Sequence, residues 1–600
     1  MLMADKPARK GRRLAQRIAA VPLKIIAAAL IFVICCASIT FCVSAAIVAV
    51  DVAQTEGGSY FAAFKERIVD FAKGAVHRVQ TGVGDERAYL ADQLEAMTQR
   101  QLETDRQLLA ELDSGLYGLE NPLAVVNPYG VSPFTAVVLF ETAQPARISL
   151  CVAGDSPKAC VEYTFSDYGT RHMLPVYGLY AARENTVTLT AEFQDGTAQE
   201  TQLRIQTDAL PDALTDERVR AAAIDERAVQ SGFTFTSLGN HSAPCKAALD
   251  INGDFRWYLD TQTDPLLRFA GYCTGYGDSC FVSCGNRNYG PAVILEMNYL
   301  GKLLNAWYTP WGVHHDIEVT PDTLLVTGST GADTPQAFVY EIDRASGEIL
   351  CRLDYAEILQ PTRDQTAANP SEIDEFYTVE DWCHINSVCE LGEDIVISAR
   401  HQSTVACTDR AGNIKWLLAD PAGYYEAFRQ YLLTPVSDDF IYPITQHNAE
   451  VLPDQDGDPN TVDLLLFDNG DYVGAAEHAG CSRIVQYRID EAAMTVEEVW
   501  SWGGDKPELY SYRHGSAQLL KNGNRLGSFE PYNASSVNRW AYGAEVDARG
   551  AAVWECWREG LSTHDYNEYR LERRDIYTDA ANDIELGTEA KLFGINEGGK

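Results

Sequence analysis

Residues 381–416 read DWCHINSVCELGEDIVISARHQSTVACTDRAGNIKW, a pattern that predicts a hairpin followed by a third strand. Two apolar runs rich in β-branched residues flank a turn at Gly392. His384 and Arg400 each stand eight residues from that glycine, so the hairpin should bring them side by side. Asn386 follows His384 by two residues and belongs to the same strand face. An imidazole, a guanidinium and an amide at one strand end predict an anion-binding pocket.

A related unit recurs along residues 209–580. Each copy has a strand, a turn usually built from Asp and Gly, and a second strand that often carries Trp. The six copies are LDINGDFRWYL (249–259), LEMNYLGKLLNAWY (295–308), YEIDRASGEIL (340–350), CTDRAGNIKWLL (407–418), YRIDEAAMTVEEVW (487–500) and EVDARGAAVWECW (545–557). Repeated short antiparallel sheets are typical of a β-propeller, and six copies predict six blades. A solenoid is the alternative, although its repeats would be more even in length.

Four of the eleven histidines occupy one position in successive copies, as His315-DIEV, His384-INSV, His447-NAEV and His514-GSAQ. Innermost blade strands begin at the central channel, so these side chains should converge at one mouth of it. Convergent titratable groups in a concave site indicate an active site. Four neighbouring residues are expected to lie outside this chemistry. His314 and His401 should face away from it, and Asp468 and Asn469 should shape a turn.

Two chemistries suit such a cluster. Neutral imidazoles are common ligands of zinc and copper, but the Arg400 cation would be unfavourable beside a metal ion. The other is transfer of an anionic group, in which an imidazole acts as nucleophile while Arg, His and Asn bind the group's oxygens.

The N-terminal part of the chain has a different character. Residues 1–24 form a basic tail, and residues 25–50 are uncharged and long enough to span a bilayer as an anchor that leaves the rest outside the cytoplasm. A cleaved signal peptide is the rival interpretation. Helical periodicity over 51–120 predicts a stalk or docking helices, and short strands over 121–208 predict a small β-sandwich. The propeller then fills 209–580, and 581–600 is a tail.

Net charge and cysteine usage restrict the partners and the compartment. A charge of −37 argues against a nucleic-acid partner, because phosphate binding needs a basic face. Twelve of the fifteen cysteines follow the apolar segment, an even number that suits an oxidising, extracytoplasmic compartment and disulfides. Cys151 and Cys160 are placed to close a hairpin, while free thiols or a zinc site remain alternatives. The oligomeric state stays open, a homodimer included.

Several long motifs resemble the bacterial arylsulfotransferases. These motifs are VHHDIEV (313–319), DWCHINSV (381–388), ISARHQS (397–403), and TQHNAEVL (445–452) with LLLFDNG (464–470). The segments NPYGVSPFTAVVLFET (127–142) and LPVYGLYAARENTVTL (174–189) resemble that family's N-terminal β-domain. The resemblance covers about residues 121–575 and implies a six-bladed propeller. It also implies transfer of a sulfuryl group from a phenolic sulfate ester to an acceptor phenol, without the nucleotide PAPS or another cofactor.

The resemblance further implies residue roles. His447 matches the histidine that becomes transiently sulfurylated, and His384, Asn386 and Arg400 match residues that bind the sulfuryl oxygens. His315 matches a channel histidine that assists proton transfer. His514 has no assigned counterpart, so a contact with the acceptor is the expectation.

Two rival functions remain at this point. One is a histidine–metal propeller hydrolase or oxidase, which would depend on added metal. The other is a non-catalytic propeller that senses an extracellular ligand and would keep its function without His447.

Overall fold

The computed structural model describes residues 86–595, except for 212–213, 215–216, 239–244, 286–291, 330–336, 363–380, 471–479, 532–539, 561–568 and 579–583. The predicted basic tail, the apolar segment 25–50 and the first part of the stalk lie outside the described residues. Within the described part, no helix combines the length and the apolar character needed to cross a membrane.

The N-terminal module is one antiparallel sheet. Strand β2 (Ala136–Val152) pairs with β1, β3, β4 and β5, and β6 pairs with β5. Buried and part-buried residues alternate along β5, as expected for a sheet that packs on one face. The remaining bounds are β1 (Leu123–Val126), β3 (Val161–Thr164), β4 (Gly169–Val176), β5 (Glu184–Phe193) and β6 (Ala198–Gln206).

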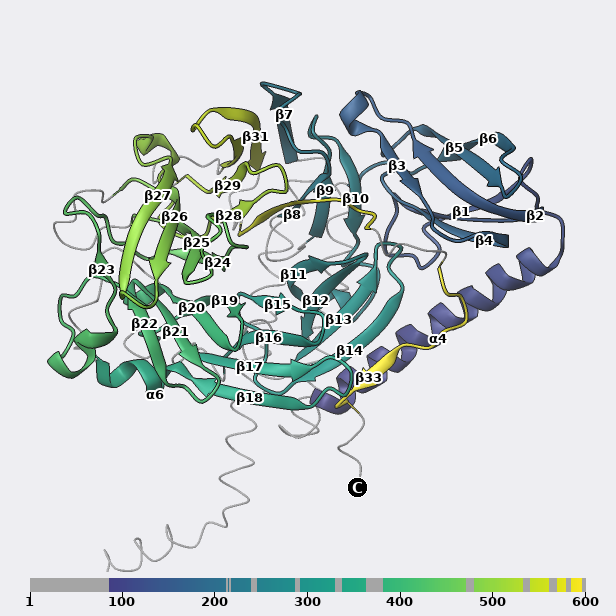
Figure 1. Cartoon of the computed structure of the whole chain (residues 1–600). Helices are drawn as coiled ribbons and strands as arrows, with labels where there is room; N and C mark the ends of the chain where they lie inside the picture. Colours follow the sequence, from purple (N-terminus) through teal and green to yellow (C-terminus); the bar gives the residue numbers. More distant parts are fainter. Residues whose placement is uncertain are drawn as a thin grey trace, which may run out of the picture. The chain divides into compact units, whose positions relative to one another are not determined.

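Six further sheets of four or five strands follow in the described residues, so the protein is mainly β (Figure 1). Sheet 1 has the order β10 (Phe255–Leu259), β9 (Cys245–Leu249), β8 (Phe233–Leu238) and β32 (Leu571–Arg574). Sheet 2 contains β11 (Ala270–Tyr276), β12 (Ser279–Gly285), β13 (Ala292–Asn298), β14 (Leu303–Thr309) and β33 (Lys591–Phe593). Sheet 3 contains β15 (Ile317–Val319), β16 (Thr323–Gly328), β17 (Phe338–Asp343) and β18 (Ile349–Asp354).

The other three sheets have the same plan. Sheet 4 contains β19 (Ile385–Leu391), β20 (Asp394–Ala399), β21 (Thr404–Asp409) and β22 (Ile414–Leu418). Sheet 5 contains β24 (His447–Val451), β25 (Thr461–Asp468), β26 (Arg483–Asp490), β27 (Thr495–Trp502) and β23 (Thr434–Pro435). Sheet 6 contains β28 (Ser516–Leu519), β29 (Arg525–Phe529), β30 (Trp540–Val546), β31 (Ala552–Gly560) and β7 (Glu217–Ala223).

The six predicted repeats are the hairpins formed by the last two strands of each sheet's up-and-down series. In the first of these hairpins, Asp250 Oδ1 accepts from the backbone N–H groups of Asn252 (2.9 Å) and Asp254 (3.1 Å). Gly253 has φ +87°, and a Cβ there would lie 3.1 Å from the side chains of Val219 and Ala221. Only glycine meets both demands without strain. The turn chemistry read from the sequence therefore sets these hairpins.

The sheets contact one another in a closed series. Trp257 of sheet 1 donates to Tyr299 O at the turn of sheet 2 (2.9 Å). Trp554 of sheet 6 donates to Ile251 O at the turn of sheet 1 (2.9 Å), so the last sheet meets the first. The intervening contacts are Trp307 with Arg344, Arg410 with Glu341, Trp416 with Glu491, and Arg525 with Gln486. β32 (Leu571–Arg574) pairs with β8 (Phe233–Leu238), which joins the last strand of the repeat region to its beginning in one sheet.

Helix α4 (Glu86–Asp113) is docked on sheet 2 rather than standing free. Gln101 bridges the β13–β14 turn, donating to Gly301 O (2.9 Å) and accepting from Leu303 N (2.8 Å). Beside it, Lys302 Nζ lies 2.7 Å from Asp105 Oδ2, and both side chains are almost fully buried. This buried pair fixes the helix against the sheet.

Removing one charge of this pair should strongly destabilise the fold. Lys302→Met is expected to lower the free energy of unfolding by about 3–5 kcal/mol, because Asp105 is left buried without its cation. Denaturant unfolding of the variant measures the change. Lys521→Met is the matched control, since the Lys521–Asp575 pair is exposed and should contribute less than about 1 kcal/mol. Equal effects of the two substitutions would contradict the assignment.

Eleven cysteines of the described residues form no disulfide, so the structure does not contain the expected Cys151–Cys160 bridge. Cys160 Sγ instead accepts from Gly154 N at 3.4 Å.

Candidate active site: a cluster of histidines at the strand starts

The four histidines in register lie where the first strands of four sheets begin. His384 immediately precedes β19, and His447 is the first residue of β24. His315 and His514 each lie two residues before their strands, β15 and β28. His315 (φ +72°), His384 (φ +52°) and His514 (φ +59°) adopt the left-handed backbone region. Non-glycine residues rarely adopt it, and such strain concentrates at functional sites.

His315 and His384 form one hydrogen-bonded chain with a carboxylate. His384 Nδ1 lies 2.6 Å from Asp381 Oδ2, and its Nε2 lies 2.9 Å from His315 Nε2. A neutral His384 that donates from Nδ1 must accept at Nε2, so His315 carries its proton on Nε2. The Tyr272 hydroxyl, 3.4 Å from His315 Nδ1, is then a donor. Asp381 was not identified from the sequence.

Arg400 lies beside this chain, as the hairpin register predicted. Its backbone N–H donates to His384 O at 3.0 Å. Its Nη1 lies 2.7 Å from His401 Nε2, and its Nη2 donates to Tyr512 O at 3.2 Å. Since a guanidinium only donates, His401 accepts at Nε2 and donates from Nδ1 to Asp381 O (2.6 Å).

Two expectations about neighbouring histidines were wrong. His401 was expected to face away, but it is fully buried, contacts Arg400, and its ring lies 4.4 Å from that of His384. His314 was expected on the opposite face, but its ring lies 3.8 Å from His315 and 5.1 Å from His384. The positive φ of His315 and the 3-10 turn Arg400–Gln402 interrupt the two-residue alternation on which the expectations rested.

His447 is held by Asn469, a residue that was expected only to shape a turn. Its Nδ1 lies 2.7 Å from Asn469 Oδ1. The Asn469 amide donates to Ser511 O (2.8 Å) and to His514 O (2.9 Å), which fixes its orientation. Asn469 Oδ1 therefore accepts the Nδ1 proton of His447, and the lone pair of His447 is on Nε2. Asn386 supports the same region, because its Nδ2 donates to Gln446 O at 2.8 Å.

Loss of Asn469 should slow any reaction that begins at His447 Nε2. Asn469→Ala is expected to reduce the rate on the order of 10²-fold, the scale of one positioned hydrogen bond at a reacting centre. Stopped-flow release of 4-nitrophenol from 4-nitrophenyl sulfate measures it. Asn460→Ala, at an exposed loop, is the control and should leave the rate unchanged. A normal rate in the Asn469 variant would contradict the tautomer assignment.

Aromatic groups and a second carboxylate complete the cluster. The Tyr569 ring stacks on His315 at 5.1 Å and lies 6.1 Å from His447. Its hydroxyl donates to Asn386 O at 3.2 Å. His514 Nδ1 lies 2.6 Å from Glu530 Oε2. Sequence reasoning found neither Tyr569 nor Glu530, because neither stands at a repeated position.

The environment keeps these imidazoles neutral. Burial lowers the pKa of His315, His384 and His447 well below the ordinary 6.5, and neighbouring histidines or Arg400 lower it further. Burial also lowers the pKa of His514, although Glu530 opposes the shift. A neutral imidazole has the lone pair that a nucleophile requires.

Two carboxyl groups, those of Glu318 and Glu450, lie on β15 and β24, the strands that follow His315 and begin with His447. Burial and neighbouring carboxylates raise the pKa of Glu318 to about 8, and burial raises that of Glu450 to about 7. Asp316 is paired with Arg570, whose Nη2 lies 2.9 Å from Asp316 Oδ1. Arg570 is therefore a second cation in the cluster, and the Asp316 carboxylate already neutralises its charge.

Two groups in the cluster also have the spacing of metal ligands. They are His314 with His315 and His384, and Asp381 with His384 and His401. Imidazole ligands of this kind suit zinc, copper or iron. A third group consists of Asp454 and Asp456 in the β24–β25 connection and Asp463 in β25. Arg488 pairs there with Asp456 (3.0 Å) and Asp463 (3.0 Å).

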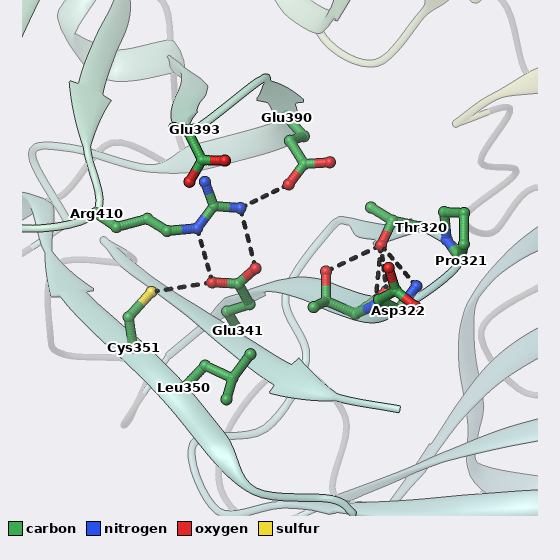
Figure 2. Close-up of a pocket in the computed structure, with 10 residues that line it drawn as sticks. Thr320, Pro321, Asp322, Glu341, Leu350, Cys351, Glu390, Glu393 and Arg410 are labelled. Carbon is green, nitrogen blue, oxygen red and sulfur yellow. Dashed lines mark hydrogen bonds and ion pairs between the residues drawn. The ribbon is translucent and has the colours of Figure 1, made fainter. Parts of the chain in front are cut away.

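A pocket on sheets 3 and 4 contains none of the predicted site residues (Figure 2). Its cation, Arg410, is occupied by Glu341 (2.9 and 3.0 Å) and Glu390 (2.6 Å). Burial raises the pKa of Cys351 in its wall to about 11, so the thiol stays protonated at neutral pH. This pocket is not suited to bind an anion.

Comparison with known proteins identifies the class and then the family. The model of the arylsulfotransferase (ASST) family matches residues 219–569, and that of the arylsulfotransferase Ig-like domain matches residues 123–208. The sheets and the histidine cluster thus belong to a sulfotransferase enzyme. The chain is a member of the arylsulfotransferase family, as its motifs indicated.

Two relatives are the arylsulfate sulfotransferases AssT of Escherichia coli O6:H1 (strain CFT073) and of Lelliottia amnigena. Each is 24% identical over 493 residues, which cover 64% of this chain and 80% of the relative. Among solved structures, cobalt-substituted Synechocystis ACO aligns over 72% of this chain and 92% of its own with 11% identity and a TM-score of 0.28. That score is too low to support an argument.

Proposed function

We propose that the protein transfers a sulfuryl group from a phenolic sulfate ester to an acceptor phenol by a ping-pong mechanism through sulfurylated His447. The observation that carries the proposal is the Asn469–His447 hydrogen bond, which leaves a lone pair on Nε2 of a buried neutral imidazole. Family membership supplies the substrate class.

The architecture belongs to the same proposal. We infer a six-bladed propeller, supported by six sheets whose contacts run from each to the next and from the last to the first. The four histidines would then meet at one mouth of its channel. The domain boundaries at 120, 208 and 580 are proposed with it, as is an extracytoplasmic catalytic part anchored through residues 25–50.

In the first half-reaction, His447 Nε2 attacks sulfur and the bond from sulfur to the phenolic oxygen breaks. Arg400 offers donors to the sulfuryl oxygens beside His384, and Asn386 holds residue 446 in place beside the nucleophile. The leaving phenolate takes a proton that enters from solvent and is passed along the His315–His384–Asp381 chain, so the two imidazoles are neutral again at the end of the step. A phenolate leaves readily, so the proposed cycle uses no cofactor and no PAPS.

The decisive experiment is intact-protein mass spectrometry of the full chain after brief exposure to 4-nitrophenyl sulfate. The proposal expects a labile gain of one sulfuryl group and faster nitrophenol release when phenol is added. Turnover without an adduct would overturn the covalent mechanism. Absence of both, in folded protein, would overturn the function.

The pH dependence of the first half-reaction follows from the lowered pKa of His447. Protonation removes the nucleophilic lone pair, so the rate should fall only when pH drops through that lowered pKa. The rate is therefore expected to stay flat from pH 8 down through 6.5, where an ordinary histidine would already be half protonated. Single-turnover nitrophenol release across this range measures it, and a half-maximal rate at pH 6.5 would contradict a neutral buried His447.

A histidine–metal reaction is the second candidate, favoured by the spacing of His314, His315 and His384. It predicts that chelator treatment abolishes turnover and that added divalent metal restores it. The sulfuryl-transfer proposal predicts no change in either treatment.

A further inference from the structure

His514 forms the second histidine–carboxylate pair of the site, separate from His384–Asp381. Its Nδ1 lies 2.6 Å from Glu530 Oε2, and the two side chains are 15% and 8% exposed. Glu530 follows β29 directly, and its backbone N–H donates to Ser511 Oγ at 2.9 Å. The carboxylate is therefore fixed on the sheet that carries His514.

The Glu530 contact determines which nitrogen of His514 is available. The carboxylate accepts the Nδ1 proton, so the lone pair lies on Nε2, across the ring from Glu530. The ring lies 6.5 Å from that of His447 and 5.4 Å from that of Tyr569. In the described part of the chain, Nε2 of His514 has no hydrogen-bond partner.

The other site histidines are already engaged. His384 uses Nδ1 for Asp381 and Nε2 for His315, and His447 uses Nδ1 for Asn469. His514 alone among these combines an orienting carboxylate with an unused second nitrogen. A base oriented by a third group in this way is the usual arrangement for proton abstraction.

We propose that His514, oriented by Glu530, is the base that takes the proton of the acceptor phenol in the second half-reaction. The inference rests on the proposed sulfuryl transfer. The phenolic O–H bond breaks and its proton goes to His514 Nε2, while the phenolic oxygen bonds to sulfur. The bond between sulfur and His447 Nε2 breaks, and its electron pair returns to that nitrogen. His514 then releases the proton to solvent.

The surrounding charges suit this role. Burial, Arg513 and Arg400 lower the pKa of His514, while Glu530 raises it, so the imidazole begins neutral and its protonated form is stabilised by the carboxylate. The rings of His447 and Tyr569 also lie beside it.

The test separates the two half-reactions in the full-length chain. For His514→Gln, adduct formation from 4-nitrophenyl sulfate should stay within about 3-fold, because nitrophenolate leaves without a proton. Decay of the adduct on adding unsubstituted phenol should slow by about 10²–10⁴-fold. The loss should shrink for acidic phenols such as 4-nitrophenol, which need less help with deprotonation. His172→Gln, a buried histidine of the N-terminal sheet, controls for replacing a buried imidazole.

Glu530→Gln provides an independent measurement. It removes the group that raises the pKa of His514, so the acidic limb of adduct decay should move to lower pH. Equal slowing of both half-reactions, unchanged decay, or an unmoved limb would overturn the proposal. If thermal melting shows that His514→Gln is not folded, the proposal is decided by Glu530→Gln alone, from the pH at which its rate of adduct decay falls. Failure of the underlying function is distinct, because the unmodified protein would then form no adduct.

Discussion

Replacing His447 with glutamine is expected to abolish both the sulfuryl adduct and transfer to phenol, with a rate loss of at least about 10⁴-fold. Nucleophile replacement removes the covalent route itself, so losses of this size are usual. Glutamine keeps a hydrogen-bonding side chain beside Asn469 but has no nucleophilic lone pair. Steady-state nitrophenol release and intact mass together measure the effect.

A companion variant separates lost chemistry from a damaged fold. His447→Gly leaves room for added imidazole, which should restore nitrophenol release in proportion to its concentration. The thermal melts of both variants should stay close to that of the unmodified protein. Substantial turnover by His447→Gln would show that sulfur is attacked by another group or directly by the acceptor.

Removing the Arg400 cation is expected to cause the next largest loss, about 10²–10³-fold in adduct formation. Arg400→Met deletes the charge that lies beside His384 and His401, so negative charge on the sulfuryl oxygens would lose its cation there. Arg400→Lys should recover only part of the rate, because an ammonium lacks the planar fork of donors.

Arg410→Met is the matched control for the loss of an arginine. Arg410 is similarly held by protein partners, but its partners are Glu341 and Glu390 of the pocket in Figure 2, away from the histidines. Its replacement should leave adduct formation within about 3-fold. If both arginine variants lose rate equally, the effect is on folding rather than on binding of the sulfuryl group.

Much of the site could be predicted because its framework is local. The turn at Gly392 places Arg400 N 3.0 Å from His384 O, as the count of residues on either side indicated. The repeated Asp–Gly turns and the strand starts likewise depend on residues close in sequence. Four histidines at one register position could therefore be expected to converge.

The failures share a physical cause. His314 and His401 were misplaced because alternation holds only for extended backbone, and each lies beside a departure from it. Asn469 was taken for a turn residue because its partners, Ser511 and the His514 carbonyl, lie more than forty residues away. A pattern of neighbouring residues does not indicate hydrogen-bond partners that are so far away along the chain.

The sequence by itself determined the mainly β fold, the hairpins and the choice of histidines, because turn chemistry and strand periodicity act over a few residues. Only the tertiary structure decided the protonation pattern. The proton positions on His384, His447 and His514 follow from Asp381, Asn469 and Glu530. Asn469 and Glu530 reach their histidines only once the antiparallel pairs β24–β25 and β28–β29 have formed. Burial then keeps the imidazoles neutral, because desolvation penalises the charged form.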